Sequence, residues 1–398
     1  MATPNVVFLS AARTPFGTFG GSLRELTATD LAVHVAKAAI ERSGLPADAI
    51  DQAIFGNVLQ TSGDAVYYAR HVALRAGCRL EAPALTVNRL CGSGFEAVVQ
   101  GANAIQRGEA DVCLVGGGES MSQAPFVARG IRWGVSLGAN PPLVDSLTEA
   151  LRDAYAGCAM AETAENLAER YKLTRAEVDA YALRSQQLAR DGWANGAYAD
   201  EVVPIAVPKS KGKGTELFAR DEHMRPDSTA AGLAKLKALF RENGTVTAGN
   251  ASGIGDGAAA IVMASEQVAA ARGLTPLAQF VSSGVAGVDP TVMGIGPVPA
   301  SRIALDRAGM TLAQMDLIEI NEAFASQTIA VERELGIPRE KLNVHGGAIA
   351  LTHPLGASGA RITAHLIHSL RRAGKQYGLG AACIGGGQGI AILLKTSI

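Results

Sequence analysis

A seven-residue pattern occurs twice in this chain, and the two copies lie 265 positions apart. Residues 88–94 read NRLCGSG and residues 353–359 read HPLGASG. The copies share the leucine, the serine and the last glycine, but in the second copy Gly356 replaces Cys91 and His353 replaces an asparagine. If the copies are the same structural element of a duplicated fold, one half supplies a nucleophile and the other a base. The chemistry would then lie where the two halves meet.

The same spacing recurs elsewhere, as a true duplication requires. Residues 39–51 and 304–316 both predict a helix ended by glycine, a short loop and an apolar strand. Residues 111–119 and 381–387 both read as a strand with three glycines, with four extra residues placed before the second copy. Chance similarity in a chain rich in glycine and alanine is the alternative, but three pairs in one order favour two similar halves.

Bulk composition narrows the class of protein. A chain of 398 residues is long enough for two or three domains with a large core. Its net charge of -1 at pH 7 gives no overall basic field for nucleic acid or an anionic membrane. The five cysteines, an odd number without a CxxC pair, fit neither a disulfide framework nor a short metal motif. Free thiols in a reducing compartment are the expected state.

The N-terminus carries no recognisable targeting pattern. Residues 1–10 move directly into an apolar strand pattern, without a charged region followed by a long apolar core. No run approaches the roughly 18 apolar residues of a membrane span. We therefore expect a cytoplasmic protein with no membrane span and no nucleic-acid partner.

Strand and helix patterns alternate along the chain. The strand patterns are short apolar runs without polar alternation, which is typical of strands buried on both faces. This order predicts an α/β fold in which helices cover the sheets. The expected strands are residues 6–9, 51–55, 112–115, 258–264, 317–320 and 383–384, and the clearest helices are residues 31–43, 95–107 and 361–373.

One long region interrupts the duplication. Residues from about 120 to 247 have no counterpart in the second half and contain both tryptophans of the chain. We expect an N-terminal half over residues 1–119, completed by about 248–270, an inserted loop domain over 120–247, and a C-terminal half over 271–398. An excursion of this size from a rigid scaffold usually carries binding residues, and contacts between subunits are the alternative.

Cys91 precedes a helix with an apolar stripe. The Gly92-Ser93-Gly94 turn that follows it permits another part of the backbone to approach closely. At a helix N-terminus, free N–H groups and the helix dipole stabilise a thiolate, so we expect a lowered pKa for this thiol. The same N–H groups can stabilise an oxyanion. The alternative is an inert buried cysteine, but the glycine-rich strand-to-helix junction favours a nucleophile.

His353 occupies the equivalent junction of the second half, and an activated cysteine needs a base within hydrogen-bond reach. His345, His365 and His368 are candidates for structural roles. Cys383 ends an apolar strand whose end lies, by the repeat, at the same sheet edge as this junction. Two cysteines and a histidine can therefore converge, either for nucleophilic and acid–base work or as a zinc site. Their wide separation in sequence favours the first interpretation, and no metal is expected.

Five blocks of the sequence resemble those of thiolases. They are residues 88–94 (NRLCGSG), 245–253 (TVTAGNASG), 321–325 (NEAFA), 346–350 (GGAIA) followed by His353-Pro354, and 383–387 (CIGGG). They occur in order over nearly the whole chain, so the resemblance is more specific than one motif. It implies the thiolase fold, an α-β-α-β-α arrangement of two duplicated α/β halves with an inserted loop domain.

The resemblance also implies the chemistry of acetyl-CoA acetyltransferases and 3-ketoacyl-CoA thiolases. Cys91, aided by His353, would take the acyl group of a 3-ketoacyl-CoA and release acetyl-CoA, and CoA would then accept the acyl group. In reverse, Cys383 would deprotonate acetyl-CoA for a Claisen condensation with an acyl-enzyme, forming acetoacetyl-CoA or a longer product. Asn321 and His353 would stabilise the enolate, and the N–H groups of Cys91 and Gly385 a second oxyanion. Such a transfer predicts ping-pong kinetics, with CoA as co-substrate and no tightly bound cofactor.

By the same resemblance, the insertion and the residues after it would bind CoA. Arg225 can meet the nucleotide by charge or stacking, and Ser252 can hydrogen-bond a pantetheine amide. The positions matched to the CoA site or the acyl pocket are Arg225, Ser252, Ala248, Met160, Leu151 and Phe324.

Two positions depart from the family pattern. Thr352 stands before His353 where the family usually has glycine. A β-branched residue disfavours a positive φ, so we expect a different local backbone or a different orientation of His353. Ala159 replaces a histidine found in acetoacetyl-specific members. That replacement indicates a roomier acyl pocket, for medium or longer 3-ketoacyl chains.

Two other classes stay open on the sequence alone. The pattern also resembles that of ketoacyl-carrier-protein synthases, which have a duplicated fold and a cysteine before a helix. Those enzymes use two histidines in place of a histidine and a cysteine, so Cys383 argues against membership of that class. A non-catalytic lipid carrier is the second alternative. The resemblance also implies a homotetramer or dimer, with the region around Trp133 as a candidate contact. The direction of the reaction and the range of chain lengths stay open.

Overall fold

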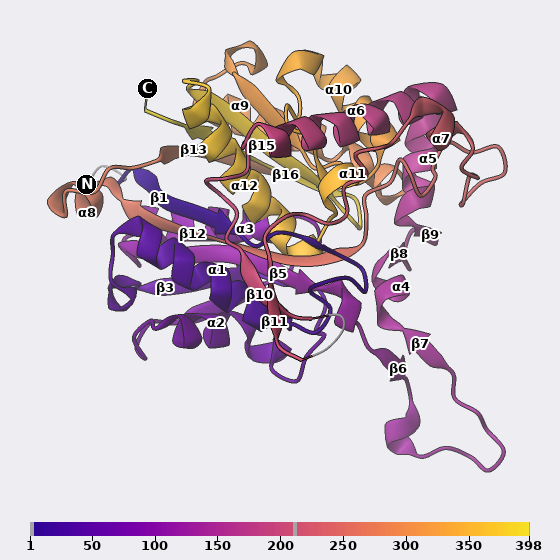
Figure 1. Cartoon of the computed structure of the whole chain (residues 1–398), viewed down its shortest axis with the longest axis horizontal. Helices are drawn as coiled ribbons and strands as arrows, with labels where there is room; N and C mark the ends of the chain where they lie inside the picture. The colour runs from indigo at the N-terminus through magenta and orange to yellow at the C-terminus, as the bar shows by residue number, and fades with distance from the viewer. Residues whose placement is uncertain (1–3, 210–212, 398) are drawn as a thin grey trace.

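The computed structural model describes residues 4–209 and 213–397. Its centre is a continuous ten-stranded sheet (Figure 1) with the spatial order β14-β15-β16-β13-β1-β12-β5-β3-β4, and β2 beside β12. Every residue of β1, β5 and β12 is buried, as predicted from unbroken apolar runs. The strands are β1 (Val6–Arg13), β2 (Gly17–Thr18), β3 (Gln52–Gly56), β4 (Ala84–Val87), β5 (Val112–Ser120), β12 (Gly255–Ser265), β13 (Ala278–Gly287), β14 (Leu317–Ile320), β15 (Tyr377–Ile384) and β16 (Gln388–Lys395).

The strand order repeats itself in reverse about the β1–β13 pair. The set β3-β5-β12-β1 on one side corresponds to β14-β15-β16-β13 on the other. In each set the first two strands are parallel and the remaining pairs are antiparallel. The register also shifts at the same point in both halves, after Phe8 in β1 and after Phe280 in β13. The predicted duplication is therefore the architecture of the sheet.

Strand register corrects one part of the predicted repeat. Gln52 pairs with Cys113 in the first half, and Leu317 pairs with Gly378 in the second. The 265-residue offset thus holds through β5 and β15, and the prediction of four extra residues is wrong. The equivalent of Cys383 is a glycine inside β5, Gly118.

The error arose because the two glycine triplets have different roles. In β5, Gly117 passes so close to the second half that a Cβ there would lie 2.0 Å from the carbonyl oxygen of Gly356. After β15, Gly386 and Gly387 have φ values of 77° and 80° and form the turn into β16. An alignment of the two triplets therefore pairs glycines of a close backbone contact with glycines of a tight turn.

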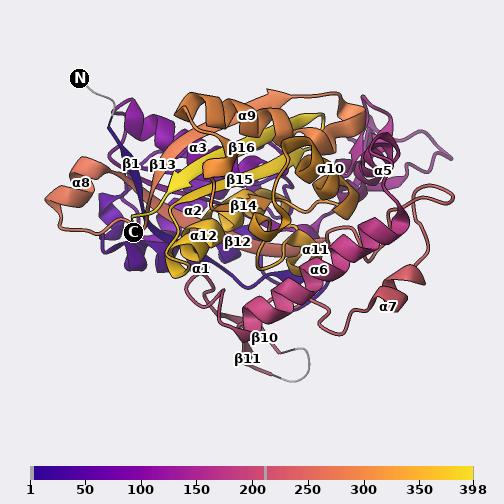
Figure 2. The ribbon, with the colours of Figure 1, turned by 90° about the horizontal axis from the view of Figure 1, so that it is seen from above.

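Helices form three layers around the two halves of the sheet (Figures 1 and 2). One apolar core lies under the outer helices of the first half, another under those of the second, and a third surrounds the two central helices. This is the predicted α-β-α-β-α arrangement. The outer helices are α1 (Ala28–Ser43) and α2 (Tyr68–Ala76) on one side and α9 (Pro297–Ala308) and α10 (Ala325–Leu335) on the other, the central pair is α3 (Ser93–Gln106) and α12 (Leu355–Arg372), and α8 (Glu266–Ala271) and α11 (Ala348–Leu351) are short.

The two central helices touch at equivalent glycines. A Cβ on Gly94 would lie 2.5 Å from a backbone nitrogen of α12, and one on Gly359 would lie 2.2 Å from a backbone nitrogen of α3. Both distances are too short for any side chain, so only glycine permits this approach. It places the residues that precede the two helices, Cys91 and His353, at the junction of the halves.

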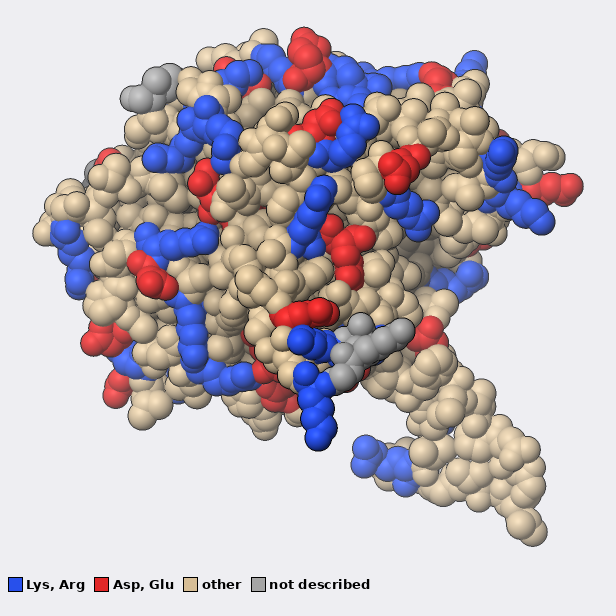
Figure 3. Space-filling model, in the orientation of Figure 1, with Lys and Arg blue, Asp and Glu red and all other residues tan. Residues whose placement is uncertain are grey.

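The inserted segment leaves the sheet after β5 and returns to it at β12. Part of it runs beside the C-terminal half, and the hairpin of β6 and β7 projects from the body (Figure 1). Figure 3 shows that this projection carries few charged groups. Its elements are β6 (Phe126–Ala128), β7 (Leu143–Asp145), α4 (Ser146–Ala150), β8 (Arg152–Asp153), β9 (Cys158–Ala159), α5 (Met160–Arg170), α6 (Arg175–Ala194), β10 (Ile205–Pro208), β11 (Thr215–Phe218) and α7 (Ala230–Ala234).

Candidate active site

The three predicted catalytic side chains come from three element ends, one in the first half and two in the second. Cys91 lies just before α3, His353 just before α12, and Cys383 is the penultimate residue of β15. The backbone N–H of Gly385, two residues after Cys383, hydrogen-bonds the Cys91 sulfur, so the end of β15 lies beside Cys91. The structure therefore brings together the two chain segments that carry the cysteines.

One apolar cavity of about 380 Å³ has His353 in its wall, and neither cysteine is among its lining residues. Two other wall residues connect it to the cysteines: Leu355 belongs to the apolar cluster that Cys91 packs against, and Met160 packs against the cluster that contains Cys383. Arg225 lies outside this cavity, at a smaller hollow that shares Ala248 with it. The predicted binding residues in the wall are Leu151, Met160, Ala248, Ser252 and Phe324.

Several residues of the cavity wall were missed in the sequence. They lie on short elements and loops of the insertion and beside β12, where no helical or strand periodicity distinguishes them. The only signal in the sequence was the apolar character of four of them, and Thr148 and Arg152 gave none. They include Met121, Thr148, Arg152, Leu239, Phe240 and Ile254.

The Cys91 thiol has a raised pKa, contrary to the sequence prediction. Burial raises it to about 11, and the nearby Glu119 carboxylate acts in the same direction. The backbone N–H groups of Gly385 and of Cys91 itself hydrogen-bond the sulfur and oppose the shift. Because burial outweighs these donors, Cys91 rests as a neutral thiol, and it would need a base to act as a nucleophile.

His353 is held in one tautomer by the first turn of α12. The hydroxyl of Ser358 donates to the Pro354 carbonyl oxygen at 2.9 Å, so its oxygen can accept from Nδ1–H of His353 at 2.5 Å. The proton therefore resides on Nδ1 and Nε2 carries the free lone pair. Burial, and then the charge of Arg361, lower the His353 pKa to about 3. The ring is neutral near pH 7 and can accept a proton at Nε2.

Asn321 lies beside that nitrogen. Its amide Nδ2 is 3.3 Å from Nε2 of His353, and the residue is fully buried. Its Oδ1 has no hydrogen-bond partner among the described residues. A buried amide oxygen without a partner suits a bound water or a polar group of a ligand.

Cys383 is enclosed more completely than Cys91. It is 0% exposed and packs with Met293, Ala323 and Phe324. Burial, and then the charge of Cys91, raise the pKa of its thiol. Within residues 4–209 and 213–397, no group of three or more His, Cys, Asp or Glu side chains is arranged to hold a metal ion.

Thr352 has the positive φ that a β-branched residue disfavours. Its φ is 78° and its ψ is 169°, in a region that essentially only glycine populates. Its hydroxyl donates to the Gly253 carbonyl oxygen at 2.6 Å, and the N–H of His353 donates to the same oxygen at 2.9 Å. The expectation of an altered backbone is therefore wrong, because these bonds hold Thr352 in a strained conformation.

Two substitutions of Thr352 separate the energetic effect of the backbone strain from that of the hydroxyl hydrogen bond. Thr352→Gly should relieve about 1–3 kcal/mol of strain but lose a hydrogen bond of about 1 kcal/mol, whereas Thr352→Val loses the bond and keeps the strain. We expect the free energy of unfolding of Thr352→Gly to exceed that of Thr352→Val by about 1 kcal/mol, after the entropy of glycine is included. Urea unfolding at one protein concentration measures this order. A more stable valine variant would show that the backbone is not strained.

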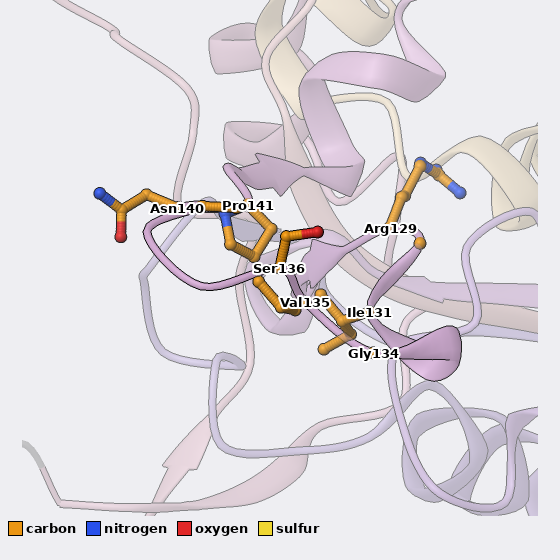
Figure 4. A pocket seen from close by; sticks show the side chains of 9 residues that line it. Arg129, Ile131, Gly134, Val135, Ser136, Asn140 and Pro141 are labelled. Atoms are coloured by element: carbon orange, nitrogen blue, oxygen red, sulfur yellow. The ribbon is translucent and has the colours of Figure 1, made fainter.

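A second hollow lies far from these groups, on the projecting hairpin. It is lined by the hairpin's own residues, among them Arg129, Ile131 and Pro141 (Figure 4), and by none of the predicted site residues. Its lining residue Arg129 forms an ion pair with the Glu149 carboxylate at 2.5 Å. The cavity beside His353 is therefore the candidate active site.

Comparison with known proteins agrees with this geometry. Residues 6–267 match the domain described as "Thiolase, N-terminal domain", and residues 274–396 match "Thiolase, C-terminal domain". The chain belongs to the thiolase family. Family membership makes it an acyltransferase with the thiolase fold, and it does not support the carrier-protein synthase or lipid-carrier alternatives.

Individual relatives cover the whole chain. The human protein "3-ketoacyl-CoA thiolase, mitochondrial" is 53% identical over 398 residues, with full coverage of both chains. The acetyl-CoA acetyltransferase of Pseudomonas aeruginosa is 49% identical over 391 residues, covering 98% of this thiolase and 99% of the relative. A crystal structure of the human mitochondrial 3-ketoacyl-CoA thiolase in complex with CoA is 52% identical, has a TM-score of 0.97, and is matched over 100% of this chain and 99% of that chain.

Proposed function

We propose that this thiolase cleaves 3-ketoacyl-CoA with free CoA, giving acetyl-CoA and a shortened acyl-CoA, and runs the reverse condensation through an acyl group on Cys91. The observation that carries the proposal is an apolar cavity that has neutral His353 in its wall and is bordered by the apolar clusters of Cys91 and Cys383. A nucleophile and two proton carriers are what this exchange requires.

In the first step, Nε2 of His353 accepts the Cys91 proton and the sulfur attacks the keto carbon of the substrate. The bond between that carbon and the α-carbon breaks, and the α-carbon takes the Cys383 proton as acetyl-CoA leaves. In the second step, CoA gives its thiol proton to Cys383 and attacks the acyl group on Cys91. The released Cys91 sulfur recovers its proton from His353, so both proton carriers return to their starting state.

Two sets of donors stabilise the negative oxygens of these steps. The N–H groups of Gly385 and Cys91 already contact the sulfur, and an oxygen on the attacked carbon would lie within their reach. Asn321 and His353 would stabilise the enolate oxygen of acetyl-CoA, through a water held by the amide. Both sets are fixed before the substrate arrives, which is the arrangement that favours catalysis.

CoA would enter along the part of the cavity that the insertion covers. Met160, Leu151 and Phe324 give an apolar wall for pantetheine, and Ala248 and Ser252 lie farther along it. Arg225, at the neighbouring hollow, would meet the nucleotide. CoA is a co-substrate in this scheme, and the chain's own side chains suffice for each proton transfer, without a metal or a tightly bound cofactor.

The acyl group would lie on the Cys91 side of the same cavity. Met121 and Leu355 line the cavity and pack near Cys91, and the small Ala159 also lies in the wall. The small side chain leaves space there, so we infer a preference for medium or longer 3-ketoacyl chains. The direction of the reaction in the cell depends on the concentrations of acetyl-CoA and CoA.

We also propose a homotetramer or dimer in the cytoplasm. The projecting hairpin exposes large apolar side chains, with Trp133 89% exposed and Leu143 69% exposed, and a second copy would cover them. No helix in the described part of the chain is long and apolar enough to cross a membrane. The human relative is named as mitochondrial, and the cytoplasmic location of this thiolase is a proposal. For the domain organisation we propose three units. They are residues 1–119 completed by about 248–270, residues 120–247, and residues 271–398.

A cleavage assay over acyl lengths tests the proposal. Acetoacetyl-CoA and 3-ketooctanoyl-CoA are each incubated with CoA, and mass spectrometry of the protein is used to detect an acyl group on Cys91. We expect cleavage of both, with kcat/KM at least as high for the longer chain. A strong preference for acetoacetyl-CoA would contradict the inferred chain length alone. Lack of CoA-dependent cleavage at every length would contradict the function.

A further inference from the structure

Glu119 is a fully buried carboxylate that the proposed mechanism does not use. It is the last residue but one of β5 and is 0% exposed. Its Oε1 accepts from Asn57 Nδ2 and Leu59 N, both at 3.0 Å. Its Oε2 accepts from Val58 N at 3.1 Å and from Gly356 N at 2.9 Å. Four donors fully occupy the two oxygens, so the side chain has one fixed position.

The four donors belong to two different halves of the fold. Residues 57–59 follow β3 in the first half, whereas Gly356 belongs to the first turn of α12 in the second. Pro354, which precedes this helix, has no side-chain group that could cap it. The Glu119 carboxylate therefore caps α12 from the other half of the chain, where the helix dipole favours a negative charge.

The duplicated half contains no such clamp. By the 265-residue offset, which the strand register confirms, the position equivalent to Glu119 is the apolar Ile384. The fold of one half can thus be completed without a carboxylate at this point. Burying a charge costs free energy unless the charged group is fully hydrogen-bonded. A buried carboxylate that is present in only one half therefore indicates a role specific to that half.

The groups tied by Glu119 surround the reacting residues. Leu59, whose N–H is one of the donors, and Leu355, which precedes the donor Gly356, belong to the apolar cluster that Cys91 packs against. Gly356 lies three residues after His353, in the turn that fixes the His353 tautomer. We propose that Glu119 is a positioning residue that sets His353 and Cys91 at their working separation by joining α12 to the segment after β3. This inference rests on the proposed function.

The charge of the carboxylate has a separate effect. Burial raises the Glu119 pKa to about 7, and the negative form in turn raises the pKa of the Cys91 thiol. Position and charge can therefore be changed independently. Glu119→Gln removes the charge and places an NH2 group against N–H donors. Glu119→Asp keeps the charge, but its shorter side chain cannot reach both donor segments.

Steady-state cleavage of 3-ketooctanoyl-CoA and the pH dependence of Cys91 alkylation test the assignment. We expect kcat to fall by about tenfold to a hundredfold in both variants, since small displacements of reacting groups have effects of this size. KM should stay within about threefold of the unmodified protein. The pH of half-maximal alkylation by iodoacetamide should fall in Glu119→Gln and stay unchanged in Glu119→Asp. The loss of kcat at nearly constant KM distinguishes positioning from a general loss of structure, and the alkylation shift reports the charge separately.

Asp316→Asn is the matched control. Asp316 accepts backbone N–H bonds from Gln376 and Tyr377, at 3.0 and 2.9 Å, at the end of β15 opposite Cys383. Its kcat should stay within about twofold, because its bonds lie away from the site. Three results would overturn the inference. The first is an equal loss of kcat in Asp316→Asn, and the second is a kcat within about twofold of the unmodified protein in either Glu119 variant. The third is failure of both Glu119 variants to fold, as judged by circular dichroism. Cys91→Ala is assayed in parallel, and full activity in that variant would instead refute the proposed function.

Discussion

Cys91→Ala should lower kcat for both cleavage and condensation by at least about a thousandfold. The alanine variant has no sulfur to attack the keto carbon, and an uncharged methyl group cannot replace it. The variant should keep its fold, since Cys91 is only half-buried and its neighbours are apolar. Steady-state rates in both directions, with circular dichroism as a check of folding, measure the effect.

Labelling identifies the residue directly. Incubation with acyl-CoA should add one acyl mass to the unmodified protein and none to Cys91→Ala. Because burial raises the Cys91 pKa to about 11, alkylation by iodoacetamide should keep rising with pH through the neutral range. Cys158→Ala is the control, since Cys158 is also half-buried and should leave both rates unchanged. An acyl group found on another cysteine would contradict the assignment of Cys91.

The duplication and the three proposed catalytic residues could be predicted from the sequence because both depend on local patterns. Apolar runs without alternation predict buried strands, and a repeat offset relates Cys91 to His353 without knowledge of distances. The strands and the α-β-α-β-α order are confirmed by the structure. The match of the glycine triplets is wrong, since a glycine in a close contact and a glycine in a turn look the same in sequence.

Energetic properties of the site could not be predicted, because they depend on burial. The helix N-terminus suggested a lowered Cys91 pKa, but burial acts more strongly and raises it. Thr352 was expected to avoid a positive φ, yet its hydroxyl and the neighbouring N–H hold it there. Glu119 gave no sequence signal at all, as its role depends on donors 60 and 237 positions away.

Cys383→Ala should separate the two half-reactions. Transfer of an acyl group from CoA to Cys91 releases a thiolate, which is a stable anion and needs little help from an acid. Condensation requires a proton to be taken from the α-carbon of acetyl-CoA, which is only weakly acidic. Burial and the nearby Cys91 raise the pKa of the Cys383 thiol, so its thiolate is a strong base where that proton must be removed. The variant should therefore retain acyl transfer and lose condensation by at least about a thousandfold.

Exchange of the acetyl-CoA methyl protons in deuterated water reports the deprotonation without the rest of the reaction. The unmodified protein should exchange them, and Cys383→Ala should not, while mass spectrometry still finds the acyl group on Cys91. Cys383→Ser keeps the shape of the side chain, but its hydroxyl ionises far less readily, so it should behave as the alanine variant does. This result would show that ionisation matters and that packing against Met293 and Ala323 does not. Equal loss of acyl transfer and of exchange would instead mean that Cys383 shapes the cavity for both steps, and the division of work between the two cysteines would be wrong.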